Sequence, residues 1–140
     1  MTRRLLWAAV VGLALLLLPF VTGCGPKEVT VSGTVTWEEG GKPKEPLKKG
    51  MILFVPEDGK TVGVSDVIRD GKYSVRMPPG KMKVEIRADR EKAGAKVDPA
   101  MGAVPRYQFI PPWYNDRTKL RAEVTAAGPN EFPFDLRDVE

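Results

Sequence analysis

The stretch "RDGKYSVRMPPGKMKVEIRA", residues 69–88, decides the fold class of this chain. Residues 81–88 alternate strictly between charged and apolar side chains, and such a period of two buries one face of a β-strand and leaves the other in water. Asp70-Gly71 tolerates positive φ at both positions, so it predicts a tight hairpin turn before a strand at 72–77. The next turn is predicted at Pro78-Pro79-Gly80. The apolar members of the alternation are Met82, Val84, Ile86 and Ala88.

Strand-like patterns recur on both sides of this stretch. Residues 29–37 alternate apolar residues with threonine and serine, and "MILFVP" at 51–56 is a short apolar run that ends at a proline. A strand at 61–69 is expected to place Val62 and Val64 on the same side. The predicted strands are residues 29–37, 51–56, 61–69, 72–77, 81–88, 120–124 and 132–136. This pattern, without a long helix, predicts an all-β fold, a seven-stranded antiparallel β-sandwich at residues 29–136 followed by a tail at 137–140.

Residues 89–117 contain four prolines and two glycines that interrupt every periodic pattern. Residues 90–97 are expected to form two helical turns at most. Within this region, "RYQFIPPWYNDR" at 106–117 concentrates aromatic and guanidinium groups, a composition favoured at protein interfaces and on sugar-binding platforms. The alternative is that the segment packs back over an open end or edge of the sandwich, with Phe109 and Trp113 in the core. The candidate interaction surface comprises Arg106, Tyr107, Phe109, Trp113 and Tyr114.

The only cysteine, Cys24, stands where an apolar run gives way to polar residues. Residues 1–23 have two arginines, an apolar stretch and a small-residue end, the layout of a signal peptide, although a membrane-spanning anchor is an alternative. Val21-Thr22-Gly23-Cys24 resembles the lipobox of bacterial lipoproteins, in which the thiol receives a diacylglyceryl group and the chain is cut just before the cysteine. We therefore expect a signal peptide at 1–23, lipidation of Cys24 and a lipidated tether at 24–28. The alternative is an ordinary buried or free cysteine.

Such an anchor predicts a location at the bacterial cell envelope, attached to the membrane by its acyl chains and facing the periplasm or the exterior. Removal of Arg3 and Arg4 with the signal peptide leaves 20 of the 22 basic residues against 18 acidic ones. A charge this close to balance does not argue for a nucleic-acid partner. A fully extended chain covers about 3.5 Å per residue, so the domain that begins at Val29 is expected within roughly 20 Å of the lipid surface.

The residue types that most catalytic and metal sites require are missing. The chain has no histidine and its one cysteine is assigned to lipid, so neither a Ser-His-Asp site nor a usual zinc site can be assembled. Carboxylates remain, and Asp66 and Asp70 with Glu57 and Asp58 are either a weak calcium candidate or a solvated turn. No metal or other cofactor is expected. A second surface candidate is the basic loop that carries Lys42, Lys44, Lys48 and Lys49, which contacts phosphate head groups or polyanions if it is not simply solvated.

Several short motifs follow one another in a fixed order. They are Val31-x-Gly33-x-Val35, Gly50-x-Ile52-x-Phe54-x-Pro56, Asp70-Gly71-x-Tyr73, Pro79-Gly80-x-Met82-x-Val84, "IPPWYND" at 110–116 and "NEFPFDL" at 130–136. In this combination, across nearly all of residues 29–136, the chain resembles the carboxypeptidase regulatory-like domain, a transthyretin-like β-sandwich. The resemblance implies a non-catalytic module, and many such domains occur as small bacterial lipoproteins. The departure here is that no enzyme is attached to the domain.

These observations predict a non-enzymatic envelope lipoprotein whose β-sandwich is a protein-interaction or structural module. A carbohydrate-binding module that presents the aromatic residues of 106–114 to glycans is the alternative. An enzyme that uses carboxylates alone is a third hypothesis, although no particular pair is selected by the sequence.

Overall fold

The computed structural model describes residues 27–139, so the predicted signal peptide and Cys24 lie outside the described residues. No helix within the described range is long and apolar enough to cross a membrane. The regular secondary structure of the described residues is β-strand, apart from one short 3-10 helix, η1 (Pro112–Tyr114). The strands are β1 (Val29–Glu38), β2 (Glu45–Pro46), β3 (Lys49–Pro56), β4 (Val64–Arg69), β5 (Lys72–Met77), β6 (Gly80–Arg87), β7 (Asp89–Glu91), β8 (Arg106–Gln108), β9 (Arg121–Val124) and β10 (Phe134–Arg137).

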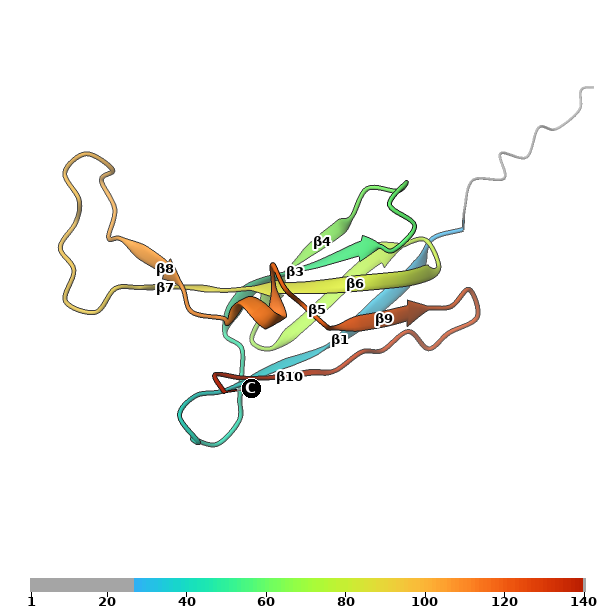
Figure 1. Cartoon of the computed structure of the whole chain (residues 1–140), viewed down its shortest axis with the longest axis horizontal. Coiled ribbons are helices and arrows are strands. Elements are labelled where there is room, and N and C mark those ends of the chain that lie inside the picture. The colour runs from blue at the N-terminus through green and yellow to red at the C-terminus, as the bar shows by residue number, and fades with distance from the viewer. Residues whose placement is uncertain (1–26, 140) are drawn as a thin grey trace, which may run out of the picture.

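Seven strands form one curled sheet in the order β10-β1-β5-β4-β3-β6-β9 (Figure 1). The short strand β2 pairs beside β1, and β7 and β8 form a separate two-stranded sheet, here called the arm. All pairings are antiparallel except β1 with β10, which run parallel. The all-β prediction is therefore confirmed. The sheet is a continuous half-barrel, however, and does not divide clearly into the two layers of the expected sandwich.

The curl of the sheet is produced at the β4–β5 hairpin. Asp70 and Gly71 have φ of 48° and 72°, the positive values expected of a tight hairpin turn. Between β4 and β5, only Arg69 and Lys72, the residues that flank the turn, are paired in register. β4 pairs along its length with β3, whereas β5 pairs along its length with β1, so the hairpin diverges and turns the sheet over itself. Periodicity shows which side chains face inward, but it does not show how far a hairpin splays.

The hydrophobic core fills the inside of the curl. All four apolar residues of the 82–88 alternation are buried, as predicted. The opposite wall comes from β1 and β5, and Phe134 and Leu136 of β10 close one side. The largest fully buried side chains are Phe54, Ile52, Ile68, Met77, Ile86, Leu136, Val31, Val35 and Val84.

The structure differs from one local prediction and narrows another. The strand expected at 61–69 begins only at Val64, and Val62 lies in the preceding loop with 84% of its surface exposed. A tight turn at Gly59, with φ of 64°, and the side chain of Asp58 hold residues 57–61 out of the sheet. Residues 90–97 form no helical turn, because Asp89–Glu91 pairs with β8 and a turn at Gly94 follows.

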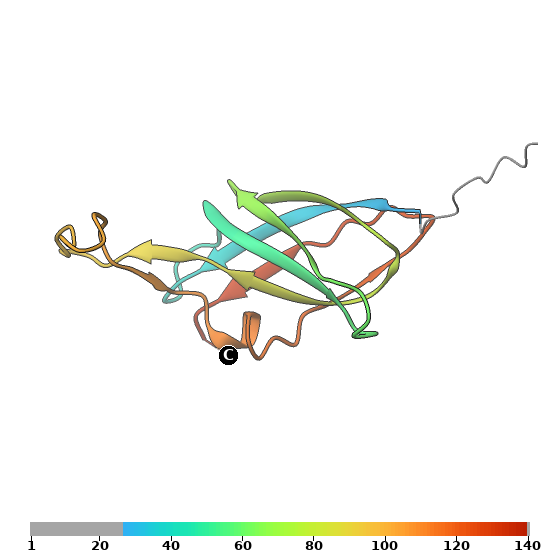
Figure 2. The same ribbon diagram turned by 90° about the horizontal axis from the view of Figure 1, so that it is seen from above.

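The molecule has two distinct ends, which both views display (Figures 1 and 2). β1 begins at one end, and the β3–β4, β5–β6 and β9–β10 connections lie in that half. The connection from β1 to β2 and the arm lie at the opposite end, and the arm projects beyond the sheet. Surface features near the start of β1 are therefore remote from those near the arm.

Candidate functional site

The five residues of the predicted interaction surface do not form one surface. Arg106 and Tyr107 lie on the arm, where Arg106 donates from Nη2 to the Asp89 carbonyl at 2.9 Å and pairs with Glu91 at 3.3 Å. Tyr107 is 47% exposed. The side chain of Arg106 thus crosses the arm and stabilises the pairing of β7 with β8. Phe109, Trp113 and Tyr114 lie on the segment that follows β8.

The segment 110–119 is held by a buried asparagine that the sequence analysis did not single out. Asn115 donates from Nδ2 to the carbonyls of Ile110 (3.1 Å) and Pro111 (3.2 Å), and its Oδ1 accepts from the Asp116 amide. Ile110 is buried in the core, while Trp113 and Tyr114 are only half-buried. Of the two residues expected in the core, Phe109 packs partly against it, and Tyr114 does so in place of Trp113. These contacts make the "IPPWYND" turn chiefly a structural element.

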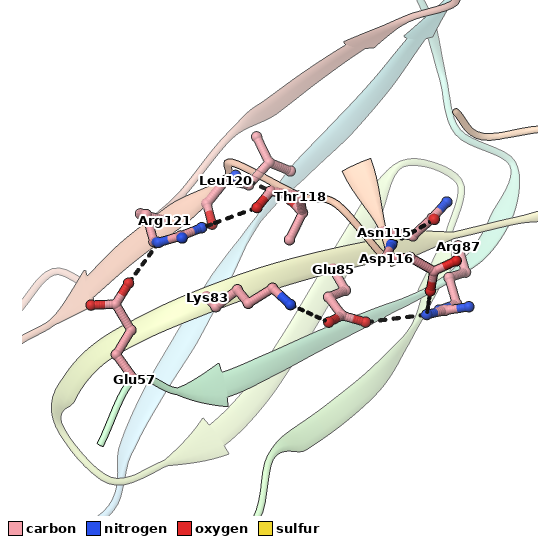
Figure 3. Close-up of polar contacts among 9 residues, drawn as sticks. All are labelled: Glu57, Lys83, Glu85, Arg87, Asn115, Asp116, Thr118, Leu120 and Arg121. Carbon is pink, nitrogen blue, oxygen red and sulfur yellow. Dashed lines mark hydrogen bonds and ion pairs between the residues drawn. The ribbon is translucent and has the colours of Figure 1, made fainter. Parts of the chain in front are cut away.

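A row of charged side chains fixes the same segment to the outer face of β6 (Figure 3). Glu85 pairs with Lys83 at 3.0 Å and with Arg87 at 3.3 Å, and Arg87 also pairs with Asp116 at 2.5 Å. The hydrogen bonds that Arg87 donates to Asp116 and then to Glu85 raise the pKa of Arg87. The side chains of this row are partly exposed, and each of them has an ion-pair partner. The row therefore attaches the η1 segment to β6, and we do not assign it as a reactive site.

Phe109 lies against the far end of β1. Its ring lies edge-on to Trp37 with the ring centroids 5.4 Å apart. The guanidinium carbon of Arg90 lies 3.7 Å from the Phe109 centroid, a cation–π contact. Arg90 is also held by Glu39, whose carboxylate oxygens accept at 2.9 and 3.2 Å. Residues from β1, β7 and the end of β8 therefore build one cluster.

The basic loop lies beside this cluster and completes a cleft. The cavity measures about 450 Å³ and is bounded by the loop after β1, the start of β3 and the base of the arm. We call it the aromatic–basic cleft and define it by Trp37, Lys42, Lys48, Lys49, Arg90 and Phe109. Two segments that the sequence flagged separately, the lysine-rich loop and the aromatic loop, thus converge on one site, together with a tryptophan that neither prediction included.

The loop that carries the lysines is fastened to the sheet. Gly40 and Gly41 have φ of 59° and 71°, which allows the chain to reverse after β1. The Gly40 amide donates to Asp138 at 2.7 Å, and Lys44 pairs with Asp135 at 2.9 Å, so both ends of the reversal are tied to the β10 region. The hydrogen bond from Lys44 and then that from Thr36 lower the pKa of Asp135. Lys44 is therefore occupied by a structural pair outside the cleft.

Some charged side chains of the cleft have an ion-pair partner and others do not. Its wall also holds Glu39, Glu45 and Asp89, so cations exceed carboxylates by one. Within residues 27–139, Lys42 and Lys49 have no ion-pair partner, and Lys48 lies 3.9 Å from Asp70 with both side chains largely exposed. A pair so exposed contributes little to stability. The cleft therefore offers available ammonium groups beside two aromatic rings.

One buried polar group in the cleft wall is unsatisfied. The Trp37 indole Nε1 is buried and has no hydrogen-bond partner in the described part of the chain. A buried donor without an acceptor costs about 1–3 kcal/mol, and native structures satisfy most such groups. Nothing in the sequence around Trp37 signalled this, because the residue simply continues the strand alternation.

The carboxylate candidates are dispersed. Asp58 accepts from the amides of Lys60 and Thr61, and these bonds lower its pKa. Asp66 accepts from the Ser74 amide at 2.9 Å, and Asp70 occupies the hairpin turn. Among residues 27–139, no three histidine, cysteine or acidic side chains come together as metal ligands. Each of these carboxylates thus has a local role in a turn or a hairpin.

Comparison of the chain with protein-family models, with curated proteins and with solved structures found no match.

Proposed function

We propose that this protein is a membrane-anchored, non-enzymatic lipoprotein of the bacterial cell envelope, whose β-domain binds a protein partner through the aromatic–basic cleft. In this proposal the domain is a variant of the transthyretin-like carboxypeptidase regulatory-like module, attached by acyl chains at Cys24. The order of the motifs across residues 29–136 supports a relation to this module, and the lipobox-like sequence at residues 21–24 supports the lipid anchor.

The observation that carries the proposal is the convergence of Trp37, Phe109 and unpaired lysines in one cleft. Aromatic rings and cations held in place by neighbouring contacts bind a partner with little loss of side-chain entropy. The Trp37–Phe109–Arg90 cluster is fixed by a ring contact, a cation–π contact and an ion pair.

This arrangement favours a partner segment that combines an apolar side chain with an acidic one. The apolar side chain would cover the Trp37 and Phe109 rings, and the acidic group would lie between Lys42 and Lys49. Because these two ammonium groups are solvated, they would mainly raise the association rate, and the rings would provide most of the affinity.

Site-specific crosslinking tests the proposal. A photo-crosslinking amino acid at position 48, in the aromatic–basic cleft, should trap one discrete envelope partner in the membrane-bound protein, whereas the same group at position 72, on the exposed face of β5, should not. Phe109→Ala and the double substitution Lys42→Glu with Lys49→Glu should each abolish the adduct. Lys72→Glu is the matched charge control. An adduct that survives both cleft variants would refute the assignment of the cleft.

Carbohydrate binding is the second candidate function, and the Trp37–Phe109 pair is the observation that gives it a site. The two rings are nearly perpendicular, at 75°, so they would clasp a sugar ring from two sides and do not form a flat platform. Quenching of the Trp37 emission by soluble glycans, measured in a Trp113→Phe background and lost in Phe109→Ala, would favour this function over a protein partner.

A further inference from the structure

The end of the domain at which β1 begins carries an exposed apolar feature. Val62, in the β3–β4 loop, is the most exposed large hydrophobic residue of the described chain, at 84%. It borders a cavity of about 300 Å³ whose wall is largely apolar. The apolar residues around this cavity include Phe54, Val62, Val64, Met77, Pro78 and Met82.

The cavity lies beside the point where the chain enters the sheet. Val29, the first residue of β1, is in register with Met77, and Met77 lines the cavity. The β5–β6 turn, from Pro78 to Gly80, lines the same cavity. The start of the domain and the loop that bears Val62 are therefore neighbours around one opening.

The length of the tether restricts how the domain can face a membrane. Only residues 25–28 separate Cys24 from Val29, and at about 3.5 Å per residue they span at most about 18 Å. β1 alone has ten residues, which at about 3.3 Å per residue give a strand of roughly 33 Å. A tether shorter than this strand cannot present the arm to the bilayer while the start of β1 points away from it.

We infer that the end bearing Val62 lies against the bilayer that holds the Cys24 acyl chains, an inference that rests on the proposed lipid anchor. Val62 enters the head-group region, and lipid covers the mouth of the cavity. The neighbouring Lys60 can keep its ammonium group among the lipid phosphates. Of the two acids that line the cavity, Glu57 pairs with Arg121 at 2.6 Å and Asp58 accepts from the loop amides of Lys60 and Thr61.

This orientation directs the aromatic–basic cleft and the arm away from the membrane. The arm and the connection from β1 to β2 lie at the end opposite the start of β1 (Figures 1 and 2), and that connection borders the cleft. The cleft is then accessible to a partner in the surrounding compartment, while the bilayer occupies the other end. A domain that lay on its side would instead bring the outer face of β4, with its exposed Val67, onto the lipid.

Depth-dependent fluorescence quenching tests the orientation in the full lipidated protein. Acylation blocks Cys24, so Val62→Cys, Val67→Cys or Val97→Cys each provides the only free thiol for a fluorescent label. Val67 and Val97 are 38% and 56% exposed, on the side of the sheet and beyond the arm respectively. The labelled protein is placed in phosphatidylethanolamine–phosphatidylglycerol vesicles with or without doxyl-labelled lipid. We expect doxyl lipid to cause a large loss of fluorescence at position 62 and none at position 97.

Two controls separate failure of the orientation from failure of the anchor. Flotation of each labelled protein with the vesicles reports the anchor, and a protein that does not float refutes the anchor and the orientation together. Flotation with equal quenching at positions 62 and 97, or with the strongest quenching at position 67, refutes the orientation and leaves the anchor standing.

Discussion

Gly33 is predicted to be the least replaceable glycine of the sheet, because the last segment of the chain crosses directly over it. A Cβ atom at position 33 would overlap the carbonyl oxygen of Phe132 and would lie 2.7 Å from the Tyr73 hydroxyl. Phe132 belongs to the segment that leads into β10, and its backbone cannot swing aside as a flexible side chain can. We therefore expect Gly33→Ala to push this segment off β1.

The size of the effect follows from the hydrogen bonds that the displacement breaks. Tyr73 Oη donates to the Phe132 carbonyl at 2.8 Å. The Phe132 amide donates to the Ser32 carbonyl at 2.9 Å, and the Ser32 amide donates to the Asn130 carbonyl at 3.0 Å. At about 1 kcal/mol for each bond, the loss is about 3 kcal/mol, at the upper end of the usual cost of overpacking. With an m-value of about 1.5 kcal/mol/M, the urea midpoint falls by about 2 M.

Urea unfolding of the domain, followed by the fluorescence of Trp37 and Trp113, measures this change. Gly94→Ala is the matched control, because nothing lies within 4 Å of its Cβ position and its φ of 73° leaves only a backbone cost of about 1 kcal/mol. Tyr73→Phe alone should cost about 1 kcal/mol but add almost nothing to Gly33→Ala, which already breaks the same bond. Fully additive effects, or a Gly33→Ala cost no larger than the control, would refute the reasoning.

Three further predictions concern stability. Asn115→Ala removes three hydrogen bonds around a buried turn and should lower the free energy of unfolding by about 2–3 kcal/mol in thermal denaturation, and an unchanged midpoint would contradict the role given to Asn115. Because Lys44 and Thr36 lower the pKa of Asp135, the ionised carboxylate stabilises the folded state above about pH 4, and this stabilisation is lost as the pH falls. The stability of Asp135→Asn should therefore decline less steeply in acid than that of the parent protein. Because burial and then the charge of Glu131 raise the pKa of Tyr73, stability should fall as the pH rises above about 10, where the phenol ionises first in the unfolded chain. Tyr73→Phe should remove this alkaline decline, and a decline that persists would assign it to another group.

The candidate site shows where reasoning from the sequence stops. Composition alone marked Phe109 and the lysine-rich loop as candidates for binding. It did not connect them, because their residues are about sixty positions apart and meet only where β1 ends beside the base of the arm. Trp113 and Tyr114 belonged to the same compositional signal, yet Asn115 and the charged row on β6 hold that turn as structure.

The sequence by itself determined the all-β class, the inward-facing residues of β6 and the hairpin turn at Asp70-Gly71. Each of these depends on neighbours two to four positions apart, where pleat and φ preferences act directly. The continuous half-barrel, the parallel pairing of β10 with β1 and the aromatic–basic cleft were decided only by the tertiary structure. Each of them depends on contacts between segments far apart in the chain: β5 with β1, β10 with β1, and the loop after β1 with the base of the arm.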